Sequence, residues 1–498
     1  MEEFSVKVIK RDGRAVEFDR HKIEIAIEKA NKEVKGKEKV TKQEIEEIIE
    51  FIEDVDKKRI LVEDIQDIIE QKLMEIKKYN LAKKYIVYRY TRALVRKQNT
   101  TDESILGLIK KTNKGILNES SNKNPIIAST QRDLIAGEVS KDLTKRVLLP
   151  EKITKAHDEK ILYFHDSEYF IQPIINSSVI NIKDMLGNGT VINGKMIDTP
   201  KSFQVACTVM AQIILAVASG QYGNQYIDIS HLGKYLRKSK NKYEEYLEEK
   251  YNDKLEKEMI KNIVLERLKQ ELNNGVQTII YQINTLITTN GKAPRTVMLL
   301  NINEDDIYKE ENNMIADEFI RQINQGIKNE KGEYEKINLP QIITEPKDIH
   351  KILEHTFDQG RVSINLAQIA KTSKKDEKLF WSLLDERTDL CYEALMYRHY
   401  ALLGTLADIS PIHWRYGAIA RLKQGESIDK LLKDGSSTLT LGYLGMQDAL
   451  ELIKNEQEKE REITTLEKNI IKFLKDKTQK WTKETGITFV LENTSSFT

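Results

Sequence analysis

Residues 4–18 read FSVKVIKRDGRAVEF, and apolar residues alternate with polar ones on both sides of a central Asp-Gly pair. This alternation predicts two short strands, and Asp12-Gly13 predicts the tight turn that joins them into a β-hairpin. Asp19 then stands at the N-cap position of a segment whose apolar residues recur at helical spacing between positions 23 and 30. The chain is therefore expected to begin with a hairpin followed by a helix.

Further helical patterns follow the first helix, and together they predict a compact leading domain. Apolar residues recur at helical spacing in three more segments, 41–54, 63–77 and 81–97. We expect residues 1–97 to form this first domain. The polar stretch 98–103 predicts a linker, so residues 98–498 are expected to form the second domain.

Composition excludes several classes of protein. The 498 residues contain 79 Lys and Arg against 78 Asp and Glu, which leaves no basic field for nucleic acid. No apolar run of 18 residues predicts a membrane span, and the first residues do not resemble a secretory signal. The two cysteines, Cys207 and Cys391, are too few for a disulfide framework or a four-cysteine zinc site. We therefore expect a soluble, cytoplasmic protein without metal ligands.

The second region mixes short apolar strands with helical patterns, which predicts an α/β domain with one sheet or barrel. The expected strands are 179–182, 296–300, 362–366 and 438–441. Residues 201–219 predict a helix that is apolar around most of its circumference, and such a helix is buried in a core or in a subunit interface. Residues 234–273 carry mixed charges and predict solvated helix.

The hairpin is also a candidate nucleotide site. Lys10, Arg11 and Lys22 could neutralise phosphates, Gly13 permits the turn, and the N-terminus of the helix that begins near Arg20 could add N–H donors. An ordinary basic hairpin on a charged surface explains the same spacing, so the pattern alone leaves both interpretations open.

The sequence of residues 5–95 closely resembles the ATP-cone, the allosteric nucleotide-binding module at the front of ribonucleotide reductases. The resemblance rests on VIKRDGR at 8–14, VEFD at 16–19 and YIVYR at 85–89. It implies that ATP binds as an activator and dATP as an inhibitor. The residues that it implies for this site are Val8, Lys10, Arg11, Gly13, Glu17, Phe18, Lys22 and Arg89.

Phrases between residues 110 and 450 resemble the anaerobic, glycyl-radical class of ribonucleoside-triphosphate reductases. Examples are TQRDLIAG at 130–137, NIKDML at 181–186 and STLTLGYLG at 437–445. The resemblance implies an α/β fold: the small ATP-cone, a β-hairpin plus helices, followed by a ten-stranded α/β barrel with an active-site loop inside it. It also implies a homodimer packed around the helix at 201–219.

The same resemblance implies a substrate pocket in the barrel. An arginine suits a phosphate, and amide and hydroxyl groups suit a ribose. The Gly and Asn positions among these residues could instead be simple barrel turns. The residues concerned are Thr130, Gln131, Arg132, His165, Asn290, Gly291, Thr440 and Gly442.

The sequence departs from the family at the residues that carry the radical chemistry. The position of the cysteine that removes the ribose 3′ hydrogen is occupied by Ala418, and that of the cysteine that donates a reducing hydrogen by Ser177. Alanine has no thiol, and a hydroxyl holds its hydrogen more tightly than a thiol does. We also expect a C-terminal truncation, because the family's glycyl-radical loop (R-V-x-G-Y) and its zinc-binding Cys-x-x-Cys hairpins are missing after residue 484.

Three hypotheses follow for the function. The family makes deoxyribonucleotides for DNA synthesis, and the chain could be one part of a split reductase, completed by a separate glycyl-radical chain and a radical-SAM activase. It could instead be a catalytically inactive, nucleotide-sensing regulatory paralogue, or an inert remnant that still folds. The losses at Ser177 and Ala418 favour sensing over autonomous catalysis.

Overall fold

The structure is a computed structural model, and it describes residues 7–9, 15–54, 59–109, 124, 126–251, 255–288, 291–302, 306–453 and 460–494. Four predicted site residues lie outside these ranges: Lys10, Arg11, Gly13 and Asn290. The chain divides into two compact units, Met1–Leu106 and Gly107–Thr498. None of the helices in the described ranges combines the length and the apolar composition that a membrane span requires.

The first unit contains a three-stranded sheet in the order β2-β1-β3. The strands are β1 (Lys7–Ile9), β2 (Ala15–Glu17) and β3 (Arg59–Leu61). β1 and β2 pair antiparallel, with Val8 opposite Val16, as the alternating pattern predicts for a hairpin. β3 pairs with β1 in parallel. Because the third helix begins directly after β3, this pairing places the hairpin beside the start of that helix.

Four helices cover this sheet, and their apolar stripes form one core. They are α1 (Arg20–Asn31), α2 (Lys42–Glu53), α3 (Val62–Glu75) and α4 (Tyr79–Ile109). α2 begins at a capping box in which Thr41 and Glu44 satisfy each other's backbone N–H groups. The expected linker at 98–103 is wrong, because α4 continues through it. These polar residues include neither Gly nor Pro, so they lower helix propensity without ending the helix.

The second unit is built on an eight-stranded sheet in the order β12-β9-β8-β5-β13-β14-β15, with β4 also paired to β13. Its strands are β4 (Leu162–Phe164), β5 (Ser177–Val179), β8 (Gln225–Asp228), β9 (Thr296–Leu299), β12 (Gln341–Ile343), β13 (Phe357–Asn365), β14 (Ser437–Leu444) and β15 (Thr488–Asn493). Three of the expected strands, 296–300, 362–366 and 438–441, overlap β9, β13 and β14 and lie in this one sheet. The strand expected at 179–182 is wrong beyond Val179, because β5 ends there and α8 (Ile182–Asn188) begins at Ile182.

Two parallel halves make up this sheet. β5, β8, β9 and β12 are parallel to one another, as are β13, β14 and β15, and the halves meet where β5 pairs antiparallel with β13. Within the described residues β12 and β15 form no pair with each other, so these eight strands are an open sheet. The α/β class is confirmed, but the expected closed barrel of ten strands is not seen in the described residues, because the two end strands of this eight-stranded sheet do not pair. The name barrel is kept for the second unit only as the family's term. The junction of the halves brings residues from β5, β13, β14 and β15 together.

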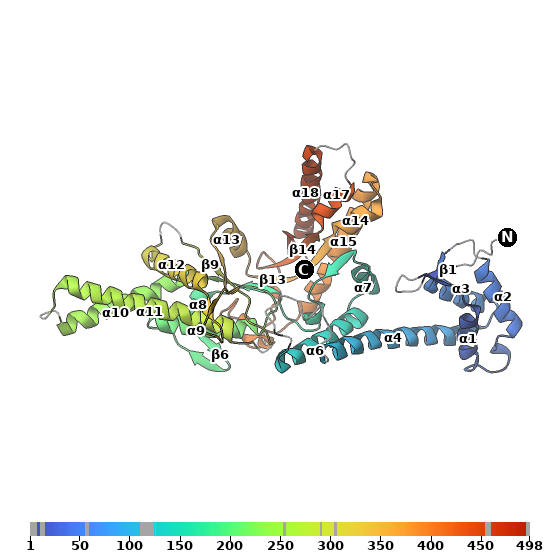
Figure 1. Cartoon of the computed structure of the whole chain (residues 1–498), viewed down its shortest axis with the longest axis horizontal. Helices are drawn as coiled ribbons and strands as arrows, with labels where there is room; N and C mark the ends of the chain where they lie inside the picture. The colour runs from blue at the N-terminus through green and yellow to red at the C-terminus, as the bar shows by residue number, and fades with distance from the viewer. Residues whose placement is uncertain are drawn as a thin grey trace. The chain divides into compact units, whose positions relative to one another are not determined.

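Each half of the sheet has its own apolar core. One core joins β13, β14 and β15 to the helices α7 (Glu151–Asp158), α14 (Leu366–Ser373), α15 (Glu377–Leu402), α17 (Met446–Ile453) and α18 (Glu460–Thr485). The other joins β8 and β9 to α8 (Ile182–Asn188), α9 (Phe203–Ala218), α10 (Gly233–Tyr251), α11 (Lys257–Thr285) and α12 (Lys309–Gln325). Figure 1 shows the two groups of helices on different sides of the sheet.

The remaining elements connect these layers. They are α6 (Ala128–Leu143), a π-helical turn (Thr144–Leu148), β6 (Thr190–Ile192), β7 (Lys195–Ile197), β10 (Ile327–Lys328), β11 (Tyr334–Glu335), α13 (Pro346–Leu353), α16 (Pro411–Trp414) and four short 3-10 turns. A fifth described 3-10 turn, Gly36–Glu38, belongs to the first unit. The long segment between α15 and β14 packs an apolar cluster around Trp414.

The apolar helix expected at 201–219 is α9, and its own chain buries most of it. α11 lies along it closely, because Gly275 leaves room for the Phe203 and Cys207 side chains, which a Cβ at that position would meet. Val209 and Ile213 are 7% and 0% exposed within the single chain. The apolar circumference of α9 is therefore explained without a second copy, and Val205, at 48% exposed, is its large outward-facing apolar residue.

Candidate functional site

The first unit contains a cavity of ≈ 180 Å³ between the hairpin, α1, α3 and α4. Four of the residues predicted for the nucleotide site lie in its wall: Val8, Glu17, Phe18 and Lys22. The other lining residues are Val16, Asp19, Ile23, Ala26, Val62, Ile65, Gln66, Ile69 and Tyr85. The wall is mainly apolar with charged groups at Glu17, Asp19 and Lys22, which suits a flat base with a charged tail.

Charge at this cavity is concentrated near the start of α1. The Nζ atom of Lys22 lies 3.0 Å from Asp19 Oδ2, and both side chains are exposed. The hydrogen bond from Lys22 holds the pKa of Asp19 below its ordinary value. Deeper in the cavity, burial raises the pKa of Tyr85, and the nearby charge of Glu70 adds to this effect. An exposed ammonium group and a buried phenol therefore lie at different depths of the same cavity.

Arg89 is held by acidic residues of α3. Its guanidinium contacts three carboxylates of α3, and among the described residues it is not one of those that line the cavity. The phosphate-side role that the resemblance implies for Arg89 stays a prediction. In the structure its partners are Glu63, Asp67 and Glu70.

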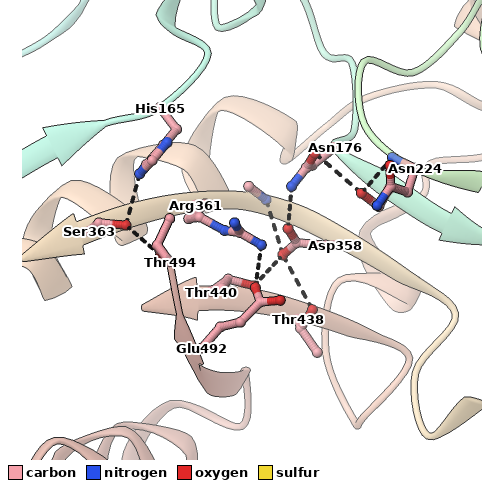
Figure 2. Close-up of polar contacts among 12 residues, drawn as sticks. His165, Asn176, Asn224, Asp358, Arg361, Ser363, Thr438, Thr440, Glu492 and Thr494 are labelled. Atoms are coloured by element: carbon pink, nitrogen blue, oxygen red, sulfur yellow. Dashed lines mark hydrogen bonds and ion pairs between the residues drawn. The ribbon is translucent and has the colours of Figure 1, made fainter. Parts of the chain in front are cut away.

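The polar site of the second unit is centred on Asp358, at the junction of the two sheet halves (Figure 2). The carboxylate accepts hydrogen bonds from Asn176 Nδ2 at 2.7 Å, Thr438 Oγ1 at 3.3 Å and Thr440 Oγ1 at 3.1 Å. The register of β13 against β14 shifts between Asp358 and Gly360, and the Asp358 side chain lies at this irregularity. Desolvation raises the pKa of Asp358, although Arg361 and these donors oppose the shift.

Beside Asp358 lies a cavity of ≈ 380 Å³, and Ser177 is part of its wall. Ser177 Oγ donates to Asn176 Oδ1 at 3.3 Å and accepts from the backbone N–H of Asn224 at 3.1 Å. Glu492, which is paired with Arg361, lies in the same wall. The predicted second cysteine position therefore opens on a cavity whose wall combines hydroxyl, carboxylate and basic groups with apolar side chains.

Ala418 is in a different environment from Ser177. It is 0% exposed and packs in the apolar core with Ile180 and Met185. Its carbonyl accepts a hydrogen bond from Asn181 N at 2.9 Å. Of the residues that the structure describes, those that line the cavity beside Ser177 do not include Ala418. The structure thus does not bring the two predicted cysteine positions to one cavity wall.

Neither actual cysteine is placed for chemistry. Cys207 and Cys391 are both 0% exposed and lie in the two apolar cores. Burial raises the pKa of each thiol above its ordinary value. Both are therefore protonated, enclosed side chains, as expected for small apolar residues.

The predicted substrate residues fall into separate groups. His165 Nε2 pairs with Ser363 Oγ at 2.8 Å, burial lowers the pKa of His165 to about 3, and Arg398 donates to its carbonyl. Gly442 faces Ser363, and a Cβ at Gly442 would overlap the Ser363 hydroxyl. Thr440 is the predicted residue that contacts Asp358. His165 is therefore neutral, and its contact with the buried Ser363 is one within the fold itself.

A second group lies at the start of α6. Thr130 Oγ1 donates to the carbonyl of Gly291 at 3.0 Å, and Gly291 has a φ of +66°. A Cβ at Gly291 would press on the Thr130 backbone, so both the conformation and the close approach require glycine there. Gln131 is partly buried and Arg132 is exposed. These residues are brought together, but they do not line the cavity beside Ser177.

Sequence reasoning did not single out Asp358, Arg361 or Glu492. The first two stand just before the predicted strand at 362–366, and Glu492 is 131 residues away from Arg361. A charged residue just before an apolar strand was the available signal for Asp358. Pairing between β13, β14 and β15 is what makes these residues a site, and no local pattern carries that information.

The arrangement of the second unit is similar to that of solved anaerobic ribonucleotide reductases. The enzyme from Thermotoga maritima with dATP bound in the specificity site aligns with a TM-score of 0.53 at 12% identity, over 80% of this chain and 76% of that one. A second structure of that enzyme, in complex with dATP and CTP, has a TM-score of 0.53 at 13% identity, over 80% of this chain and 75% of that one. The fold is therefore that of a ribonucleotide reductase of the anaerobic class.

Sequence comparison identifies the family. The profile described as anaerobic ribonucleoside-triphosphate reductase matches residues 119–359 and 345–496, and that of the ATP cone domain matches residues 6–94. The anaerobic ribonucleoside-triphosphate reductase of Haemophilus influenzae is 30% identical over 98% of this chain and 77% of its own length. That of Salmonella typhimurium is 28% identical over 98% and 76%. The chain belongs to the anaerobic ribonucleoside-triphosphate reductase family, and it carries an ATP-cone.

Proposed function

We propose that this chain is a nucleotide-sensing member of the family that does not reduce ribonucleotides by itself. One observation carries the proposal: the two positions that should hold thiols are Ser177 and Ala418. The radical chemistry implied by the resemblance begins with a sulfur radical that takes a hydrogen from ribose. Alanine supplies no such atom, and the serine O–H bond is too strong to replace the thiol.

The remaining sulfur atoms offer no substitute. Cys207 and Cys391 are fully buried in separate apolar cores, and a ribonucleotide could reach them only through unfolding. This supports inactivity of the barrel as it stands. A split reductase that is completed by a separate glycyl-radical chain or activated by a radical-SAM enzyme remains a prediction, and the alanine at 418 counts against it.

The cone supports the sensing part of the proposal. Its cavity combines an apolar wall with an exposed lysine at the start of α1, which suits an adenine base and a phosphate chain. By the relatives' pattern, ATP and dATP are the proposed effectors, acting as activator and inhibitor. The predicted phosphate ligands Lys10 and Arg11 would complete this site. A cytoplasmic location, a homodimer and the lack of metal ligands and of a glycyl radical likewise remain predictions.

Calorimetry on the full chain tests the sensing role. ATP and dATP are titrated separately into the protein, and CTP serves as a control for binding in the barrel. We expect saturable binding of both adenine nucleotides, weakened by about 2–4 kcal/mol when Lys10 and Arg11 are both replaced by Ala, because charge-assisted hydrogen bonds contribute roughly 1.5–3 kcal/mol each. No binding of either nucleotide at millimolar concentration would refute the proposal.

A further inference from the structure

Arg89 joins α4 to α3 through a guanidinium whose two terminal nitrogens both contact carboxylates. Its Nη1 atom lies 2.6 Å from Asp67 Oδ1 and 2.9 Å from Glu70 Oε1, and its Nη2 atom lies 2.8 Å from Glu63 Oε2. The three acids are spaced i, i+4 and i+7, so they form one stripe along α3. Arg89 is only 23% exposed. We call this group, Arg89 with Glu63, Asp67 and Glu70, the Arg89 clamp.

The clamp lies next to the wall of the cone cavity. Val62, Gln66 and Ile69, each adjacent in sequence to one of the three acids, face the cavity. On the other helix, Tyr85 is the lining residue that α4 contributes, and it precedes Arg89 by four residues, about one helical turn. The clamp therefore fixes the separation of the two helices at the level where both contribute to the cavity wall.

The same contacts argue against Arg89 as a phosphate ligand. Both terminal nitrogens of its guanidinium are engaged by carboxylates, and in the contacts among the described residues three acids share this one cation. A triphosphate would have to displace carboxylates and approach a locally negative surface. Such an exchange is unfavourable unless the phosphates form better contacts than the ones they replace.

We infer that Arg89 is a positioning residue for the nucleotide site: by clamping α4 to α3 it sets the place of Tyr85 in the cavity wall before any nucleotide binds. This inference rests on the proposed function of the cone as a nucleotide site. It differs from the resemblance, which puts Arg89 on the phosphates. It also predicts that replacing Arg89 loosens the attachment of α4 to α3 already in the nucleotide-free protein.

Two measurements on the full chain test the inference: hydrogen exchange of the nucleotide-free protein and calorimetry with ATP. In Arg89→Gln we expect faster amide exchange in residues 79–90 and an ATP affinity lower by about 3- to 10-fold, the range of a partly exposed ion-pair cluster. Arg89→Lys keeps one cation and should give intermediate values. Lys84→Gln is the matched control, because Lys84 on the same helix pairs with the exposed Glu33, at 3.4 Å, and is not among the described residues that line the cavity.

The outcomes separate the alternatives. Unchanged exchange with weaker ATP binding would show a direct phosphate contact and overturn the inference. Faster exchange with unchanged affinity would make the clamp merely structural, and would also overturn it. If the wild type binds no ATP, the proposed function fails, whereas the exchange data still decide whether the clamp holds α4. Should Arg89→Gln fail to fold, Asp67→Asn, at the most exposed of the three acids, provides the same comparison.

Discussion

The cavity of the cone and the cavity beside Ser177 differ in how closely their residues match those that the resemblance implies. In the cone, the described residues that the resemblance assigns to the wall, such as Val8 and Phe18, do line a cavity. In the second unit, a polar pocket lies around Asp358, and the residues that the resemblance aligns with the thiol positions are Ser177 and Ala418. Binding depends on shape and a few charges, which many side chains can supply. Radical chemistry depends on particular atoms, so a single replacement ends it.

The largest effect should come from filling the cone cavity. In Ala26→Trp the indole would occupy the ≈ 180 Å³ space beside Ile23 and Tyr85. We expect ATP affinity to fall more than about 100-fold, which corresponds to about 2.8 kcal/mol. Calorimetry measures the affinity, and the thermal unfolding of the second unit should not change. Retained ATP binding would place the nucleotide site outside this cavity.

Thiol labelling should expose the contrast between the two lost cysteine positions. Ser177→Cys puts a thiol in a cavity wall, whereas Ala418→Cys puts one in an apolar core at 0% exposure. We expect a disulfide reagent to label the first variant at least about 100-fold faster, because a buried thiol reacts only through local opening. The wild type measures the background from Cys207 and Cys391. Equal rates would show that the segment around Ala418 opens onto the cavity.

The buried carboxylate of the barrel should make stability depend on pH. The pKa of Asp358 is raised above 3.8 in the folded protein. As pH rises from 3.8 through the raised pKa, the unfolded state releases its proton first, so the wild type loses stability. Asp358→Asn lacks this titration. Denaturant unfolding of both proteins across this range should show that the free energy of unfolding of the wild type falls relative to that of Asp358→Asn as pH rises. Parallel curves would disprove the desolvation of Asp358.

The smallest effect on folding is expected on the outer face of α9. Val205 is 48% exposed, so Val205→Asp should change the free energy of unfolding by less than about 0.5 kcal/mol. If α9 forms the predicted homodimer, the same charge should convert the dimer to a monomer in sedimentation. Ile213→Asp serves as a contrast, since it buries a charge at 0% exposure and should unfold the second unit. An unchanged dimer of Val205→Asp would place the interface elsewhere.

Local patterns predicted the main elements of the first unit and some of those of the second. The hairpin, the helices α1 to α3 and the strand β14 follow from alternation, helical period and turn residues, which act over a few positions. The helix through 98–103 was missed because polar residues weaken a helix without stopping it. The apolar surface of α9 indicated burial correctly, but sequence could not tell whether the covering surface belongs to the same chain.

The sites were less accessible to sequence reasoning. The cone wall was predicted where a resemblance named its residues, whereas the Arg89 clamp depends on how two helices approach each other. The Asp358 network joins three strands and the Asn176 side chain across 264 residues of sequence, from Asn176 to Thr440. Such contacts follow from sheet pairing, which the period of a single strand does not determine.

The most direct test of the central claim is anaerobic turnover by the unmodified full chain. The protein is incubated with ribonucleoside triphosphates, an activase, S-adenosylmethionine, formate or a dithiol, and a glycyl-loop fragment supplied in trans. We predict deoxyribonucleotide formation no greater than in a reaction without the protein, while ATP still binds to the same preparation. Deoxyribonucleotide formation above that background would contradict the assignment of Ala418 to the thiol position, and with it the proposal that this chain senses nucleotides without reducing them.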